Sequence, residues 1–494
     1  MKKCVVIGSG LGGLSCGIIL AKNGYKVTVL EQGDQIGGCL QCFRRGDTLF
    51  ETGMHYIGSA NKGETLYQIL NYLGVYNKIT LSELNPCGYD VVSFKGRHYR
   101  FANSKEAFIN SFAEMFPQNR KELEEYYNLI QKVTAAQAMH SLSNSVDIDI
   151  NTKYRLTSIE DVMKQRISNP LLREVLCAVN PLYAGEKDKT PFSLHSLIFD
   201  FYNKSAFRIV GGSSTLADAL SDKIKELGGE VLTRHKVAKI ECSGNIAKSV
   251  QTTEGERFEA DLVICAIHPS LFVDMVDSTA VRSVYKNRIR CTKNTIGAFT
   301  VYLKFKKERV KYMNNNLFYY RGDSVWNTSY SKEEWPPHIL YMHVCHKENP
   351  EWAESGQILT YMNFNEMLPW ENTKIGQRGE EYKVFKKKRA EAAILALDEE
   401  VGGIAENIES YYTSTPLTYR DYTGIPEGSM YGAAKDVTAA AGGEISSKTP
   451  IENILLTGES ITCHGMLGVL AGSLVTCSYI IPKEKLLEEI KNCS

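Results

Sequence analysis

The first residues of the chain whose type and spacing indicate a binding site are glycines. Residues 8–13 (GSGLGG) have the spacing G-x-G-x-x-G. Gly8 permits a tight turn, Gly10 lets backbone approach a pyrophosphate, and Gly13 allows a helix to pack closely on a strand. Glu31, 18 positions after Gly13, can accept hydrogen bonds from an adenosine ribose. The pattern predicts a dinucleotide site, and an acidic residue rather than an arginine here argues against a 2′-phosphate and so against NADP in this site.

Two strands and a helix must position these residues. Residues 3–7 read as a short buried strand, the segment from the glycines to Asn23 has helical character, and residues 26–30 form the next strand. In such a strand-turn-helix unit, the free N–H groups at the helix N-terminus point at the phosphates. Because the strand, the glycines, the helix and the acidic residue agree, we favour a nucleotide site over a plain glycine-rich turn.

Further segments extend the pattern. Gly37 and Gly38 form a second glycine pair shortly after Glu31, which is typical of FAD enzymes rather than NAD dehydrogenases. With these motifs the chain resembles the FAD-dependent family of carotenoid desaturases, carotenoid isomerases and retinol saturases, and it is most similar to the retinol saturases. Residues 208–210 (RIV) replace the aromatic and proline residues that are more usual in the family. The resemblance covers nearly the whole chain and rests further on residues 50–58 (FETGMHYIG), 190–195 (TPFSLH), 211–213 (GGS), 428–432 (GSMYG), 456–460 (LTGES) and 463–468 (CHGMLG).

The resemblance implies FAD as the cofactor, held by residues from separate parts of the chain. No metal site is expected. The residues expected to contact FAD are Gly8, Ser9, Gly10, Leu11, Gly12, Gly13, Glu31, Gln32, Gly37, Gly38, Met54, His55, Val237, Gly458, Glu459, Met466, Leu467 and Gly468.

The resemblance also implies an FAD-dependent oxidoreductase that acts on carbon–carbon double bonds, by saturation or desaturation, in an apolar isoprenoid or polyene-like substrate. The flavin moves a hydride, while the protein orients the substrate and supplies or removes one proton. Three alternatives stay open: a flavin-dependent double-bond isomerase without net redox change, an FAD amine oxidase, and a non-catalytic prenyl-binding protein. Amine oxidation usually needs an aromatic cage that the sequence does not identify, and the intact phosphate glycines argue against loss of the cofactor.

Two polar residues are the candidates for handling that proton. His55 and Tyr431 both lie in segments that resemble flavin-proximal parts of the family. A protonated histidine or a neutral tyrosine could deliver the proton; the competing interpretations are a packed histidine and a structural hydroxyl. Because a phenol stays protonated at neutral pH without any special environment, we expect Tyr431→Phe to be more damaging than His55→Ala.

The expected fold is α/β, with a Rossmann-like FAD-binding domain assembled from discontinuous segments and a substrate domain of mixed sheet and helices. Residues 230–240 read as one strand that follows a helix, and residues 299–305 alternate as on a strand. Together with the resemblance, these patterns divide the chain into FAD-binding parts 1–72, 206–280 and 440–494, and substrate parts 73–205 and 281–439.

The composition bears on nucleic-acid binding and on the redox compartment of the protein. The chain of 494 residues has 57 basic and 57 acidic residues, so it carries no electrostatic footprint for nucleic acid. The odd number of cysteines, 13, fits a reducing cytoplasm better than a disulfide framework, and we expect a cytoplasmic protein. Cys39 and Cys42 form a C-x-x-C pair, but no thioredoxin-like pattern surrounds them, so ordinary thiols are favoured over a redox disulfide.

The expected partner is a small apolar substrate. Since the chain has a single G-x-G-x-x-G, NAD(P)H or another electron carrier could only visit transiently. An apolar substrate is compatible with peripheral membrane contact, which no pattern in the sequence supports.

Overall fold

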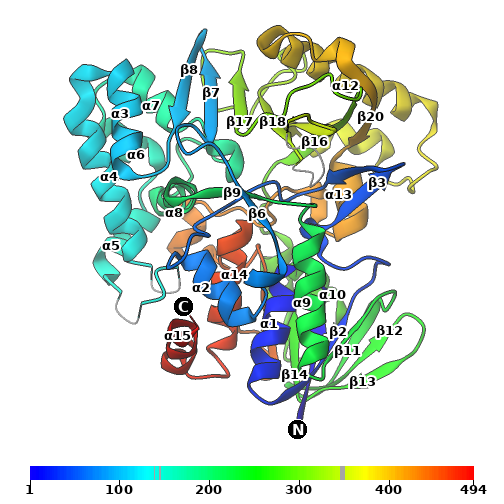
Figure 1. Cartoon of the computed structure of the whole chain (residues 1–494). Helices are drawn as coiled ribbons and strands as arrows, with labels where there is room; N and C mark the ends of the chain where they lie inside the picture. The colour runs from blue at the N-terminus through cyan, green and yellow to red at the C-terminus, as the bar shows by residue number, and fades with distance from the viewer. Residues whose placement is uncertain (138–139, 144–145, 345–350, 494) are drawn as a thin grey trace.

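The computed structural model describes residues 1–137, 140–143, 146–344 and 351–493. The chain forms two parts, each built around a sheet (Figure 1). The first part contains five parallel strands in the order β10-β2-β1-β14-β21. Their bounds are β1 (Lys2–Ile7), β2 (Tyr25–Leu30), β10 (Glu230–Leu232), β14 (Leu262–Cys265) and β21 (Ile454–Leu456).

This parallel sheet is covered on both faces, as its continuous apolar strands require. Along β1, Cys4 and Val6 pack on one face against the helices α1, α9 and α14. Val5 and Ile7 pack on the other face against β11, β12 and α10, because successive side chains of a strand point to opposite faces. The covering elements are α1 (Leu11–Lys22), α9 (Ser214–Glu226), α10 (Pro269–Met275), α14 (Gly465–Cys477), β11 (Val237–Ser243) and β12 (Ile246–Thr252).

The expected single strand over residues 230–240 is wrong, because the structure divides it. β10 belongs to the parallel sheet, whereas β11 belongs to a four-stranded sheet in the order β13-β12-β11-β15, with β13 (Arg257–Glu259) and β15 (Val276–Asp277). Between them Arg234 adopts a φ of +60°. The N–H groups of Arg234 and His235 donate to the carbonyl oxygens of Gly33 and Glu31, which turns the chain away from the sheet edge.

The second part is built on a seven-stranded sheet in the order β20-β16-β19-β18-β17-β7-β8. Only β17 and β7 pair in parallel, so the sheet is mixed, as expected. Its strands are β7 (Asp90–Phe94), β8 (Arg97–Phe101), β16 (Gly297–Phe305), β17 (Asn316–Tyr320), β18 (Ile339–His343), β19 (Ser355–Met362) and β20 (Ile408–Ser414).

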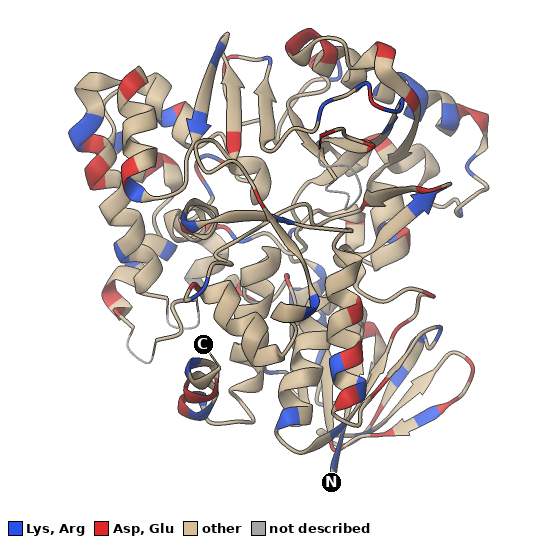
Figure 2. Ribbon diagram, in the orientation of Figure 1, with Lys and Arg blue, Asp and Glu red and all other residues tan. Residues whose placement is uncertain are grey.

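Helices cover this sheet as well. Leu340 and Met342 of β18 belong to the core shared with the helices on the left of Figure 1, while Ile339 and Tyr341 belong to the core shared with α12. Figure 2 shows acidic and basic residues interspersed on outer helices such as α4 and α9. The helices are α3 (Lys105–Met115), α4 (Arg120–Ala135), α5 (Ile148–Arg155), α6 (Ile159–Arg166), α7 (Pro170–Leu176), α8 (Phe192–Lys204), α12 (Gly379–Val401) and α13 (Pro416–Thr423).

Small sheets connect the two parts. β9 (Ala206–Ile209) pairs with β5 (Ile57–Gly58) and β6 (Leu81–Glu83), and β3 (Cys42–Arg45) pairs with β4 (Thr48–Glu51) in a hairpin. The remaining helices are α2 (Thr65–Leu73), α11 (Ser283–Arg290) and α15 (Lys483–Asn492). Within the described ranges, no helix combines the length and apolarity needed to cross a bilayer.

The strands of the parallel sheet come from segments 1–72, 206–280 and 440–494, and those of the large sheet from 73–205 and 281–439. The α/β fold class is therefore confirmed, while the residue boundaries between domains stay a prediction.

The contact of β5 with α8 generates a stability prediction. A Cβ on Gly58 would lie 2.1 Å from the carbonyl oxygen of Phe201. Because this oxygen belongs to the backbone of α8, it cannot move aside as a flexible side chain could. We expect Gly58→Ala to destabilise the protein by about 1–3 kcal/mol through overpacking. The measurement is the thermal unfolding midpoint by circular dichroism. Gly322→Ala is the control, because a Cβ there meets nothing within 4 Å; equal midpoints for the two variants would contradict the expected clash.

Candidate active site

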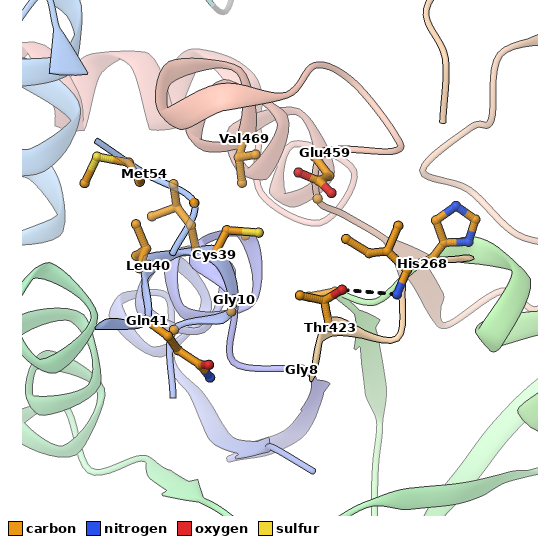
Figure 3. A pocket seen from close by; sticks show the side chains of 18 of the residues that line it. Gly8, Gly10, Cys39, Leu40, Gln41, Met54, His268, Thr423, Glu459 and Val469 are labelled. Atoms are coloured by element: carbon orange, nitrogen blue, oxygen red, sulfur yellow. Dashed lines mark hydrogen bonds between the residues drawn. The ribbon is translucent and has the colours of Figure 1, made fainter. Parts of the chain in front are cut away.

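One cavity extends from the glycine loop to the large sheet. It is lined at one end by residues at the carboxyl ends of β1 and β2, and at the other by residues of β16, β18 and β19. Figure 3 shows side chains from separate parts of the chain, among them Cys39, Met54 and Glu459, gathered around Gly10. The carboxyl ends of parallel strands are where open α/β sheets bind ligands.

The glycine loop leaves room for a ligand at the start of α1. Gly10 is the N-cap of α1, and a Cβ on it would meet nothing within 4 Å. Gly13, by contrast, is in close contact with Gly8: a Cβ on Gly13 would lie 2.1 Å from the carbonyl oxygen of Gly8. Gly10 therefore borders open space above the helix N-terminus, and Gly13 holds the helix against the strand, as their spacing predicts.

Glu31 has a structural task besides the expected contact with a ribose. One carboxylate oxygen accepts hydrogen bonds from the N–H and the hydroxyl of Ser9, at 3.0 and 2.6 Å, and the other accepts from the N–H of Gly33 at 2.8 Å. Each oxygen retains acceptor capacity, and Glu31 lines the cavity. The carboxylate thus fixes the glycine loop at the end of β2 and stays available to a ligand.

The second glycine pair passes directly over the first loop. Gly37 donates its N–H to the carbonyl oxygen of Ser9, and its φ is +109°. Gly38 has a φ of +57°, and a Cβ on it would lie 3.2 Å from the Cα of Gly10. Both positions thus need glycine, for conformation and for close approach.

The C-terminal segment supplies a buried carboxyl group. Glu459 lines the cavity, and among the described residues its Oε1 has no hydrogen-bond partner. Burial raises the pKa of Glu459 to about 7, against the opposing charge of Lys435. Gly458, with a φ of +110°, leaves open space beside it. A ligand with hydroxyl groups would form the missing hydrogen bonds to this carboxyl group. The ribityl and ribose portions of FAD carry such groups.

The structure brings most of the expected cofactor residues to the cavity but leaves three outside its lining. Gly13 packs on Gly8, Leu467 is buried in the core beneath α1, and a Cβ on Gly468 would lie 2.9 Å from Cys463. These three residues support the site from behind. The expected residues that line it are Gly8, Ser9, Gly10, Leu11, Gly12, Glu31, Gln32, Gly37, Gly38, Met54, His55, Val237, Gly458, Glu459 and Met466.

Three residues that follow β14 also line the cavity and were not expected from the sequence, namely Ala266, Ile267 and His268. A signal was available, because they come directly after a buried parallel strand and before Pro269, at the edge where ligands bind.

The two cysteines of the C-x-x-C pair face different surroundings. Cys39 presents its surface to the cavity, and its depth in the protein raises the pKa of its thiol to about 12 (Figure 3). The Sγ of Cys42 lies 3.5 Å from the hydroxyl oxygen of Ser213. Both are free thiols in the structure, and the absence of a redox role stays a prediction.

His55 is a neutral imidazole at the cavity wall. Burial, assisted by the positive charge of Arg208, lowers its pKa to about 3. The Nε2 of Gln357 lies 2.5 Å from the Nδ1 of His55, and in this orientation of the amide it donates to Nδ1, which places the ring proton on Nε2. That Nε2 is buried, and no group in the described part of the chain bonds to it. A protonated histidine as the proton donor, one of the two options above, does not suit these surroundings.

Tyr431 also lines the cavity, but its hydroxyl is engaged. The hydroxyl donates to the carbonyl oxygen of Pro181 at 3.0 Å, and the ring lies against His464 with centroids 4.3 Å apart. Burial raises the pKa of Tyr431 above its ordinary value, which makes the phenol a weaker acid. Catalytic roles for His55 and Tyr431 stay predictions. The hydroxyl of Tyr431 is engaged, whereas the Nε2 of the neutral His55 has no partner among the described residues, so we favour His55 over Tyr431 as the group that gives the proton.

The end of the cavity away from the glycine loop is apolar. Its side chains come from the large sheet and from the loops that face it. The tyrosines Tyr56 and Tyr202 lie beside it with ring centroids 4.3 Å apart. The aliphatic and thioether residues of this wall are Leu182, Ala298, Leu340, Met342, Leu359 and Met430.

Comparison with known proteins agrees with this site. Residues 11–308, more than half of the chain, match the family model described as flavin containing amine oxidoreductase. The chain belongs to this family. It is 27% identical to the all-trans-retinol 13,14-reductase of Rattus norvegicus over 99% of this chain and 86% of that protein. It is 23% identical to the 1-hydroxycarotenoid 3,4-desaturase of a Flavobacterium species over 89% of this chain and 91% of that protein.

The fold is also found among solved structures. An oxidoreductase from Methanosarcina mazei superposes with a TM-score of 0.66 at 16% identity, over 96% of this chain and 100% of that one. Family membership confirms FAD as the cofactor and the protein as an FAD-dependent oxidoreductase. The two sequence relatives confirm the resemblance to retinol saturases and carotenoid desaturases.

The residues present fit FAD. The open space at Gly10 and the N-terminus of α1 would hold the pyrophosphate, and Glu31 would hold the adenosine ribose. The Oε1 of Glu459, which has no partner among the described residues, would bind hydroxyl groups of the ligand.

The open space at Gly10 generates a direct test. We expect Gly10→Val to fold, because no protein atom lies where its Cβ would go, and to purify without flavin, because its side chain fills the space of the pyrophosphate. The measurement is the flavin absorbance per protein together with the circular dichroism spectrum. Gly322→Val, the same change at another open position, should keep a full complement of flavin. Stoichiometric FAD in Gly10→Val would show that the phosphate site lies elsewhere.

Proposed function

We propose that the protein reduces a carbon–carbon double bond in an apolar polyene or isoprenoid, with FAD as its redox cofactor. The observation that carries this proposal is a single cavity in which the dinucleotide cradle continues into the apolar wall of the large sheet. A long hydrocarbon chain would bury its surface against that wall, and such burial is favourable by about 25 cal/mol per Å². The reductase and desaturase relatives, named for a retinoid and a carotenoid, support the same class of substrate.

The charge state of the cavity supports an uncharged substrate. The acidic residues that line the cavity, Glu31 and Glu459, both lie at its dinucleotide end, and burial keeps His55 neutral. An alkylammonium ion would need a fully ionised carboxylate, or an electron-rich cage, to replace its water. None of the described residues that line the apolar end of the cavity is an acid, which favours a polyene over an amine.

When bound, FAD supplies hydride transfer through the N5 atom of its ring system. The chain's own residues must hold the substrate against the apolar wall, keep water away from the reacting carbons, and deliver one proton to the carbon that does not receive the hydride. We propose that the electrons come from a nicotinamide nucleotide or another carrier that visits transiently, since the sequence contains a single dinucleotide fingerprint.

The proposal is tested by anaerobic photoreduction of the purified protein, followed by mixing with separate solutions of retinoids, carotenoids, enones and amines. We expect a polyene to reoxidise the flavin and to gain two hydrogens, as measured by mass spectrometry. A product of unchanged mass would indicate an isomerase. Reoxidation by no compound of the panel, or release of the amine's aldehyde after air oxidation, would overturn the proposed reaction.

The two proton candidates are distinguished by substitution. We expect His55→Ala to slow reoxidation of the reduced flavin by polyene about 10²- to 10⁴-fold, the usual contribution of general acid catalysis. Tyr431→Phe should have a smaller effect, because it removes a hydrogen bond to the carbonyl oxygen of Pro181. Stopped-flow absorbance measures both rates, with flavin content as the control. A larger loss in Tyr431→Phe would restore the order expected from sequence, and wild-type rates in both would assign the proton to water or another group.

A further inference from the structure

A buried carboxyl group lies directly behind His55. Glu51, the last residue of β4, has its Oε2 4.0 Å from the Nδ1 of His55, and its residue surface is 4% exposed. Its Oε1 accepts a hydrogen bond from the N–H of Ser213 at 3.1 Å. His55 thus lies between this carboxyl group and the cavity.

The cation nearest to this pair directs its hydrogen bonds elsewhere. Arg208 is 2% exposed, and its guanidinium donates to the carbonyl oxygens of His343 and Asn315 and to the side-chain oxygen of Asn316. All three acceptors are uncharged. Arg208 therefore acts on Glu51 through its field, without a direct ion pair that would hold the carboxylate ionised.

The pair accordingly carries two protons that can move, one on the carboxyl group of Glu51 and one on the Nε2 of His55. Burial raises the pKa of this carboxyl group to about 8, although Arg208 and the N–H of Ser213 both lower it. His55 is neutral at the same pH, with a bare Nδ1 on the side of Glu51 and its proton on Nε2. This arrangement is the reverse of an exposed Glu–His pair, in which the carboxylate would be ionised.

Gln357 is able to serve His55 in either tautomer. Its Nε2 now donates to the bare Nδ1, while its Oε1 is buried and bonded to nothing that the structure describes. Rotation of the amide by half a turn would let that oxygen accept from an Nδ1–H group. Gln357 lies on β19 opposite Met342, which lines the cavity, so this rotation of the amide would take place at the cavity wall.

We propose that Glu51 is a positioning residue that stores the proton consumed in the reduction and passes it to the cavity through His55. The proposal rests on the proposed function. As the Nε2 proton of His55 moves to one substrate carbon, the carboxyl proton of Glu51 moves to Nδ1, and the imidazole is neutral before and after. Bound FAD in its reduced form would supply the hydride to the other carbon. The relay is reset when the Nε2 of His55 takes a proton from water in the cavity and the Nδ1 proton returns to the Glu51 carboxylate, which is buried.

The 4.0 Å separation must shorten by about 1 Å for this transfer. Catalytic hydrogen bonds in ligand-free structures are often long and tighten when the substrate binds. In the step, Gln357 releases Nδ1 as its amide turns, and its free oxygen then accepts the new Nδ1–H.

The discriminating variant is Glu51→Gln, which keeps the volume and an acceptor for Ser213 but has no acidic proton. We expect reoxidation of the photoreduced flavin by polyene to slow about 10²-fold, with KM and flavin content unchanged. Asp90→Asn is the matched control: Asp90 is also fully buried with its pKa raised to about 7, but its partners are Asn316 and Tyr56. That variant should stay within a few-fold of wild type, and Glu51→Asp should recover part of the rate.

The pH dependence gives a second, non-structural readout. Raising the pH ionises Glu51 and removes the stored proton, so the wild-type rate should fall as pH rises through about 8. The rate of Glu51→Gln should be low and lack that step. The groups that face Glu51 are Arg208, His55, Cys42 and the N–H of Ser213. Cys42, whose own pKa is raised by burial, is checked with Cys42→Ser, which should keep the pH step.

Infrared spectroscopy of the flavin-free protein tests the stored proton without turnover. At pH 7 the difference between wild type and Glu51→Gln should contain the C=O stretch of a protonated carboxyl group, which is lost when the pH is raised. An ionised Glu51 at pH 7, or wild-type turnover in Glu51→Gln, would overturn the inference while leaving the proposed function in place. If the wild-type enzyme reduces no polyene, the proposed function fails, and the use of the stored proton fails with it even where the infrared band is present.

Discussion

The close contact between Gly13 and Gly8 fixes the start of α1 against the end of β1, and the other segments of the site are arranged around this contact. With only 2.1 Å between the carbonyl oxygen of Gly8 and an imagined Cβ on Gly13, the first turn of α1 is in direct contact with the end of β1. Two distant segments then close on the same turn: Gly38 approaches Gly10, and a Cβ on Gly12 would lie 3.3 Å from the Cα of Gly458. Glycine at these positions lets three pieces of backbone meet around one opening, which side chains would otherwise fill.

Beyond that opening, removal from water governs the chemistry. Arg208 satisfies its charge with uncharged oxygens, and its field lowers the pKa values of His55, Glu51 and Asp90. For the two carboxyl groups desolvation is the larger effect and raises the pKa, whereas for His55 both effects act in the same direction. A buried cation and carboxyl groups with raised pKa values therefore coexist in the protein interior behind His55. The residue responsible lies where residues 208–210 depart from the family's usual pattern.

Local patterns predicted the local parts of this site. The spacing of the glycines and Glu31 was sufficient for the cradle, because turn geometry, helix start and strand end are all set within 31 residues. The division of residues 230–240 was missed, since it depends on N–H groups of Arg234 and His235 that bond to a loop 200 positions earlier. No pattern in the sequence indicated Gln357, because its contact with His55 is created by the strand order of the large sheet. The hydrogen bond of Tyr431 to Pro181 was equally invisible, and it changes the preferred proton donor.

The same fold serves proteins that add hydrogen to double bonds and proteins that remove it, as the reductase and desaturase relatives indicate. The glycine cradle is indifferent to this choice, since it binds the cofactor in both cases. What differs is whether a group at the reacting carbon must give a proton or take one. A carboxyl group kept neutral by burial is ready to give, and an exposed one would be ionised and ready to take. In the proposed reduction, Glu51, buried behind a neutral histidine, is therefore the group placed to give the proton.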